Sequence, residues 1–247
     1  MYVISPHIAH RWAVFTLATT TSTLAGCTLA NAHPWALDTA DTADTGALDD
    51  TTPCDPYYGF SAEGTVWDWQ VSTLAMEGWE RVELTWMNPE TGEVQTRTTG
   101  EHDFIAFTYT FDRTDDWICG TTGLYQVGWT STWQVQSPDG VLSRSGVNTV
   151  LWDTPMRNLT ASPEVGDSWW YYGTTTITNE LGEVFTQDVV SERVIRIQAE
   201  EEIDTVLGTI SALRVDQYHG PSIWWAQDYG VVKRSGMTLI GYTPGTP

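Results

Sequence analysis

Alternation of apolar and polar residues in short segments is the feature that most limits how this chain can fold. In the segment 125–136, the apolar residues that share one face of an extended chain are Tyr125, Val127, Trp129, Trp133 and Val135. A period of two places successive side chains on opposite faces of a β-strand, so the pattern predicts a half-buried antiparallel strand. Because similar alternation occurs at 82–86, 107–112 and 213–215, we predict an all-β domain of about ten or eleven strands.

Turn-forming residues separate these strands at short intervals. The clearest turns are expected at 88–92, 137–140 and 180–183, which are rich in Pro, Gly, Asn, Asp or Glu. Short connections favour hairpins between consecutive strands, so we predict an antiparallel meander that forms a half-barrel or barrel, with a β-sandwich as the alternative. The pattern breaks at 158–166, which we interpret as a connection within a single domain spanning 57–247, with a boundary between two domains as the alternative.

The first 26 residues have the composition of a secretory signal peptide. Arg11 is followed by an apolar stretch too short to span a bilayer, and no acidic residue precedes Asp38. The sequence Leu-Ala-Gly-Cys at 24–27 resembles a bacterial lipobox, and this resemblance implies that Cys27 is lipid-modified and becomes the first mature residue. Thr28 then implies sorting to the bacterial outer membrane or cell surface, because enteric bacteria use Asp there for retention in the inner membrane. A conventional cleavage site at 30–32 is the alternative.

The cysteines and the charge restrict the function further. With Cys27 lipidated, Cys54 and Cys119 remain as a pair in an oxidising compartment, which predicts a disulfide; two separate buried thiols are the alternative. A net charge of −21 argues against nucleic acid as a partner. Residues 27–56 contain six aspartates and no lysine or arginine, so we predict an acidic, disordered tether between the lipid anchor and the domain.

The last third of the chain resembles a family of bacterial envelope proteins of unassigned function. The resemblance is carried by Val-Gly-Asp-Ser-Trp at 165–169, by the segment 204–215 and by Trp-Trp-Ala-Gln-Asp-Tyr-Gly-Val-Val-Lys at 224–233. It implies a curved β-sheet like that of the lipoprotein carriers LolA and LolB, in which an apolar concavity holds acyl chains. The helices that close this concavity in the carriers have no counterpart in the sequence.

Tryptophans are the candidate ligand-binding residues. We select Trp67, Trp69, Trp129, Trp133, Trp169, Trp224 and Trp225. Trp67 and Trp69 share a strand face and would suit a sugar-binding platform if exposed, whereas the adjacent pairs 169–170 and 224–225 point to opposite faces. Alternatively, most of these rings fill the core. An apolar concavity would favour a lipid-like ligand, and a filled interior would favour a structural role.

Catalytic and metal-binding patterns are not recognisable in the sequence. The acidic cluster at 200–204 is interpreted as a solvated hairpin end, and His33, His102 and His219 as tether or loop residues. We predict no catalytic residue, no metal and no cofactor. The leading function is a membrane-anchored envelope lipoprotein that binds an apolar or amphipathic component, or a protein partner, on an aromatic sheet face. The alternatives are a cell-surface carbohydrate-binding module and, third, a hydrolase with two carboxylates facing across a cleft.

Overall fold

The computed structural model describes residues 54, 56–178, 181–217 and 221–246. By its internal contacts the chain divides into Met1–Thr45 and Gly46–Pro247, and every described residue belongs to the second unit. The predicted signal peptide, Cys27, nearly all of the acidic tether, His33 and His219 lie outside the described residues.

The described residues are almost entirely β-strands, which confirms the predicted all-β class. A short 3-10 helix, η1 (Pro56–Tyr58), precedes them. The strands are β1 (Val66–Ser72), β2 (Met76–Asn88), β3 (Glu93–Phe104), β4 (Thr108–Gly120), β5 (Gly123–Gln136), β6 (Ser143–Thr160), β7 (Ser168–Thr178), β8 (Val184–Thr205), β9 (Gly208–Gln217), β10 (Ile223–Ala226), β11 (Gly230–Arg234) and β12 (Met237–Thr243). Within the described ranges, no helix has the length and apolar character needed to cross a membrane.

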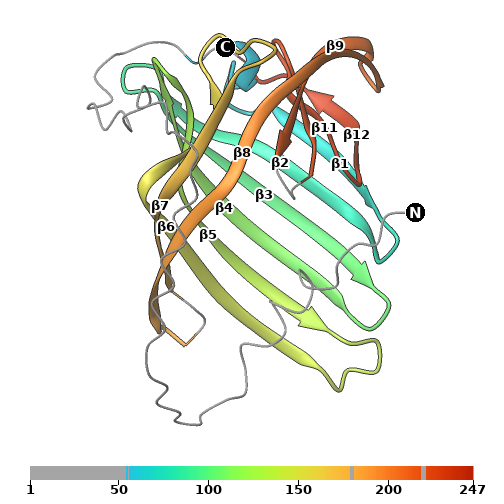
Figure 1. The fold of residues 1–247 in the computed structure, drawn as a ribbon. Coiled ribbons are helices and arrows are strands. Elements are labelled where there is room, and N and C mark those ends of the chain that lie inside the picture. The colour runs from blue at the N-terminus through green and yellow to red at the C-terminus, as the bar shows by residue number, and fades with distance from the viewer. Residues whose placement is uncertain (1–53, 55, 179–180, 218–220, 247) are drawn as a thin grey trace. The chain divides into compact units, whose positions relative to one another are not determined.

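The strands form the predicted antiparallel meander (Figure 1). Each strand pairs with the next along the chain, and β1 pairs with both β2 and β12. The order of pairing therefore returns to its start and curves one sheet around an interior. All strands belong to this single sheet, so the alternative of two stacked sheets is wrong.

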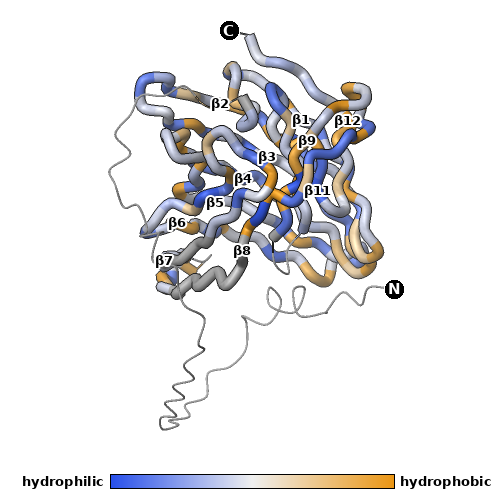
Figure 2. Tube along the Cα trace, turned by 45° about the horizontal axis from the view of Figure 1, so that its top comes forward, coloured by the Kyte–Doolittle hydropathy of each residue, from blue (hydrophilic) through white to orange (hydrophobic). Residues whose placement is uncertain are grey.

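Alternation along the strands separates an inner from an outer face. Hydrophobic and hydrophilic residues follow one another along the strands in Figure 2. In β1, Trp67, Trp69 and Val71 are buried inside, whereas Gln70 and Ser72 are exposed. The main core extends from η1 over the inner face of the sheet and includes Trp67, Trp69, Leu84, Leu124, Trp169, Leu213 and Trp225. This core gathers near the end of the sheet that carries the β2–β3, β4–β5 and β6–β7 turns.

Two bulges shift the predicted faces by one residue. In β5 the register shifts between Gln126 and Gly128, so Gln126 is buried while Tyr125 is only half-buried. In β2 the register shifts between Leu84 and Trp86, which leaves Trp86 44 % exposed although Leu84 is fully buried. A bulge inserts one extra residue into a strand and exchanges the faces beyond it. The expectation of one unbroken apolar face along 125–136 and 82–86 was therefore wrong.

The predicted disulfide is confirmed. Cys54 and Cys119 are joined, with their Cα atoms 5.2 Å apart. Cys119 lies at the end of β4, so the bond ties the start of the described chain to the core end of the sheet. The predicted alternative of two separate thiols is wrong.

Candidate functional site

Charged side chains gather on the inner face of the sheet, where a purely structural core would have apolar ones. They come from four strands: Glu80 from β2, His102 from β3, Arg113 and Asp115 from β4, and Arg234 from β11. Alternation explains their position, because Arg113 and Asp115 continue the inward series that begins with Tyr109 and Phe111. We call these five residues the inner polar cluster.

Asp115 is the most deeply buried member of the inner polar cluster. Its side chain is 1 % exposed, and Arg113 Nε donates to Oδ2 over 2.8 Å. Gln126 Nε2, brought inside by the β5 bulge, donates to Oδ1 over 2.7 Å. Burial raises the pKa of Asp115 and outweighs the lowering by Arg113 and Gln126. Both carboxylate oxygens thus have protein partners.

Glu80 and His102 form the second pair of the cluster. The distance from His102 Nε2 to Glu80 Oε1 is 3.0 Å, and both side chains are 13 % exposed. Burial alone would raise the pKa of Glu80, but the His102 hydrogen bond and the charges of Arg234 and Arg113 together lower it. The prediction that His102 is a loop residue was wrong, because it lies within β3 opposite Gly78 and Tyr109.

Arg234 connects the cluster to the tryptophans of the core. Its guanidinium carbon lies 5.4 Å from the centre of the Trp69 ring, within range of a cation–π contact. Burial lowers the pKa of Arg234, while the charges of Glu80 and Asp115 raise it less strongly. Among the described residues, the buried Nε of Arg234 has no hydrogen-bond acceptor.

A small cavity lies beside Arg234 on the inner face. Its volume is about 70 Å³, and its walls include Tyr58, Trp67, Trp69, Trp117, Trp225 and Arg234. Sites that enclose a drug-sized ligand measure roughly 300–1,000 Å³, so this cavity accommodates a group of a few heavy atoms and not an acyl chain. The cavity alone does not provide the long apolar concavity that the LolA/LolB-like resemblance implies.

The indole groups around the cavity differ in whether their N–H groups are used. Trp67 Nε1 donates to the carbonyl oxygen of Tyr229 over 2.7 Å, and Trp117 Nε1 donates to Thr96 Oγ1 over 3.0 Å. The Nε1 atoms of Trp69 and Trp225 are buried and have no acceptor among the described residues. Two buried donors therefore remain unsatisfied beside the guanidinium of Arg234.

Half-buried aromatic residues continue the inner face beyond the polar cluster. The rings of Tyr109 and Phe111 are stacked with centres 5.5 Å apart, and His102 meets Phe111 edge-on at 5.2 Å. Trp133 lies opposite Phe111 in β5, and Trp129 lies opposite Asp115. Since these inward-facing rings are only partly covered, they form an aromatic wall that remains in contact with solvent.

The structure brings together some of the tryptophans selected from the sequence and separates others. Trp67, Trp69 and Trp225 meet at the cavity, and Trp129 and Trp133 belong to the aromatic wall. Trp169 is 3 % exposed in the core, and its Nε1 donates to the carbonyl oxygen of Arg157. Trp224 faces outward, as expected for a residue adjacent to the inward Trp225. Since Trp67 and Trp69 are 5 % and 1 % exposed, they do not form an exposed sugar platform.

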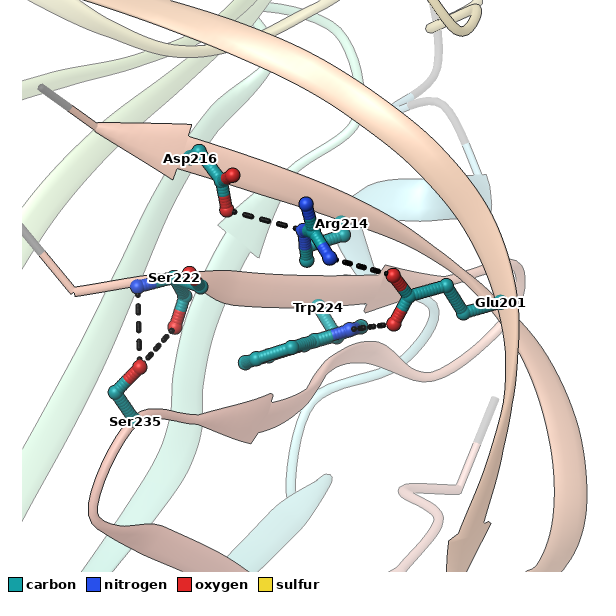
Figure 3. A network of polar contacts seen from close by, with 6 residues as sticks. All are labelled: Glu201, Arg214, Asp216, Ser222, Trp224 and Ser235. Atoms are coloured by element: carbon teal, nitrogen blue, oxygen red, sulfur yellow. Dashed lines mark hydrogen bonds and ion pairs between the residues drawn. The ribbon is translucent and has the colours of Figure 1, made fainter.

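Glu201, one residue of the acidic cluster at 200–204, belongs to an outer polar network (Figure 3). Arg214 Nη1 donates to Glu201 Oε1 over 2.7 Å, and Trp224 Nε1 donates to Glu201 Oε2 over 3.0 Å. Arg214 also forms an ion pair with Asp216 at 3.2 Å, and Lys233 lies 4.6 Å from the centre of the Trp224 ring. Glu200, Glu202 and Asp204 are exposed near the β8–β9 turn, in agreement with the interpretation of the cluster as a solvated hairpin end.

Sequence reasoning missed Glu80, Arg113, Asp115, Gln126 and Arg234. A pattern for two of them was present, because the alternation through Tyr109 and Phe111 extends to Arg113 and Asp115. In the described part of the chain, no three His, Cys, Asp or Glu side chains are grouped so as to hold a metal ion.

No protein-family model matches this chain, and neither a curated protein nor a solved structure matches it.

Proposed function

We propose that this protein is a non-catalytic bacterial envelope lipoprotein that binds an amphipathic molecule on the inner face of its sheet. Cys27 would carry the lipid anchor, and the acidic tether would hold the domain off the outer membrane or cell surface. The observation that supports binding most directly is the inner polar cluster, placed between an aromatic-lined cavity and a half-buried aromatic wall.

Energetics favour a binding role for this arrangement over a purely structural one. Taking an ion out of water costs several kcal/mol, and well-packed apolar side chains in its place are often neutral or stabilising. Buried charges with shifted pKa values gather preferentially at functional sites. Two carboxyl groups and two guanidinium groups inside one sheet therefore point to recognition of a polar group.

The surroundings of the cluster suggest an amphipathic ligand. The polar part of the ligand would meet the cluster, and its apolar part would lie against Tyr109, Phe111 and Trp133. Because the cavity measures only about 70 Å³, the apolar part would remain on the aromatic wall and would not be fully enclosed. A partly open aromatic wall of this kind differs from the acyl-chain concavity implied by the resemblance to LolA and LolB.

Native mass spectrometry of the full chain tests the binding proposal. The chain carries Cys27→Ser, so that its own lipid cannot be mistaken for a ligand, and is exported to keep the disulfide. We expect a copurified adduct that is lost in Trp133→Ala but kept in Trp79→Ala, which alters the outer face, where Trp79 is 46 % exposed. An adduct-free mass for a folded, disulfide-bonded chain would contradict the proposal.

Membrane fractionation tests the anchor separately. The unaltered chain should sediment with membranes and resist extraction by high salt, since two or more acyl chains give lasting attachment. Cys27→Ser should move it to the soluble fraction. Continued sedimentation of the variant, once mass spectrometry shows that its signal peptide has been removed, would show that Cys27 does not carry the attachment.

A carbohydrate-binding role has one observation in its favour. Trp79 and Trp86 of β2 are 46 % and 44 % exposed, and large exposed aromatic rings mark interaction surfaces. Affinity electrophoresis in gels that contain soluble cell-surface polysaccharide tests this role. Retardation that is lost in Trp79→Ala but kept in Trp133→Ala would favour glycan recognition over the inner-face proposal.

A further inference from the structure

We infer that the ligand presents a carboxylate-type oxyanion to Trp69, Trp225 and Arg234 in the small cavity. This inference rests on the proposed function, because it specifies the polar end of the inner-face ligand. It assigns the anionic group to three donors that the protein leaves unused.

The two indole groups are buried donors without acceptors. Trp69 is 1 % exposed and Trp225 is 6 % exposed, and both line the cavity. Their Nε1 atoms have no acceptor among the residues that the structure describes. Buried N–H groups are almost always hydrogen-bonded in folded proteins, so two unsatisfied ones in one cavity indicate a missing acceptor.

Arg234 supplies the positive charge at the same cavity. Its buried Nε has no acceptor among the described residues, although its guanidinium lies over the Trp69 ring. The carboxylates that face it have other hydrogen-bond partners: Asp115 binds Arg113 and Gln126, and Glu80 binds His102. An incoming anion can therefore bind Arg234 without displacing an existing hydrogen bond of these carboxylates.

The chemistry of the three groups selects an acceptor. Indole and guanidinium N–H groups donate hydrogen bonds and cannot accept them. A ligand hydroxyl or ammonium group in the cavity would therefore form weaker or fewer hydrogen bonds with them than an oxyanion would. A cavity of about 70 Å³ is roughly half the size of an engineered cavity that holds benzene, which suits a carboxylate of three or four heavy atoms. A positive neighbour strengthens each hydrogen bond to such an anion.

A carboxylate can come from a small free anion or from the head group of an amphiphile, and three probes separate these sources. Isothermal titration of the Cys27→Ser chain is carried out with acetate, octanoate and octan-1-ol at one pH and ionic strength. We expect octanoate to bind at least about tenfold more tightly than octan-1-ol, which corresponds to one charge-assisted hydrogen bond.

Matched variants locate the interaction. Arg234→Gln should abolish the preference for octanoate, whereas Lys233→Gln makes the same charge change on the outer face and should leave the preference intact. Trp225→Phe removes one donor and should reduce the preference by about fivefold or more, whereas Trp224→Phe should not. Circular dichroism of each variant reports whether it has folded. If Arg234→Gln does not fold, the comparison of Trp225→Phe with Trp224→Phe still tests the inference.

The outcomes distinguish this inference from the proposed function. Equal affinity for octanoate and octan-1-ol, or a preference unchanged in Arg234→Gln and Trp225→Phe, would overturn the inference and leave amphiphile binding intact. Acetate that binds as tightly as octanoate would support the oxyanion site and overturn the amphipathic part of the proposed function. Failure of all three probes to bind the folded chain would overturn both.

Discussion

His102 Nε2 lies 3.0 Å from Glu80 Oε1 on the inner face of the sheet, between neighbouring strands β2 and β3. Both side chains are 13 % exposed, so water screens their interaction only weakly. The bond gives Glu80 a role in stability that depends on pH.

Replacing Glu80 by Gln should destabilise the protein at neutral pH but not in acid. The folded pKa of Glu80 is lowered from its ordinary value of 4.5, so its contribution is present above that value and is lost as pH falls through the folded pKa. We expect a loss of about 1.5–3 kcal/mol in the free energy of unfolding at pH 7, typical of a hydrogen bond to a charged group. Urea denaturation at pH 7 and pH 3 measures the difference, and an equal loss at both values would contradict the assignment.

Replacing Asp115 by Asn should have the opposite pH dependence. Burial raises the folded pKa of Asp115 above 3.8. The contribution of protonated Asp115 to the free energy of unfolding is therefore fully present below pH 3.8 and is lost as pH rises through the folded pKa. The permanently neutral Asn should therefore gain stability relative to the unaltered chain as pH rises from 3 to 7. The same denaturation series tests this, and a relative loss over that interval would show that the Arg113 ion pair outweighs burial.

Removing the disulfide should destabilise the domain substantially. Cys54 and Cys119 are separated by 65 residues, and closing a loop of that length stabilises the folded state by about 4 kcal/mol in the chain-entropy model. We predict a loss of about 2–4 kcal/mol for the double change Cys54→Ser and Cys119→Ser, measured by urea denaturation. Reducing the unaltered chain should give the same midpoint as the double variant. A loss below about 1 kcal/mol would contradict this prediction, because it would show that the disulfide lies outside the part of the domain that unfolds cooperatively.

A side chain at Gly59 should destabilise the folded protein. Its φ of +74° favours glycine, and a Cβ there would lie 2.7 Å from backbone atoms of Gly230 in β11. Gly64 has a similar φ of +79° but open space around it, so Gly64→Ala isolates the backbone cost of about 1–2 kcal/mol. We expect Gly59→Ala to cost at least about twice as much as Gly64→Ala in thermal or urea denaturation. Equal costs would indicate that η1 moves away from β11 without penalty.

Local periodicity was sufficient to predict much of the fold. The alternation at Tyr109 and Phe111, and at Leu213 and Val215, assigned these residues to the inner face, and the number of cysteines predicted the disulfide. Each of these predictions depends on neighbours along the chain or on the number of cysteines, both of which can be read from the sequence.

The inner site could not be predicted in the same way. Gly128 lies at the β5 bulge that buries Gln126, but a glycine within a strand does not by itself fix the register, and one extra residue exchanges every face beyond it. Arg234 meets Trp69 only because β12 lies between β11 and β1, a pairing between the two ends of the domain. Long-range closure of this kind depends on the whole sheet and not on a local pattern.

Indole N–H resonances provide the most direct test of binding at the inner face. Selective ¹⁵N labelling of tryptophan in the Cys27→Ser chain, with assignment by Trp→Phe variants, allows each indole to be followed during octanoate titration. We predict large downfield shifts of the Trp69 and Trp225 N–H protons, with little change at Trp67 and Trp224, whose N–H groups already have protein acceptors. Shifts confined to the exposed Trp79 and Trp86, or no shifts at saturating octanoate, would contradict binding inside the sheet.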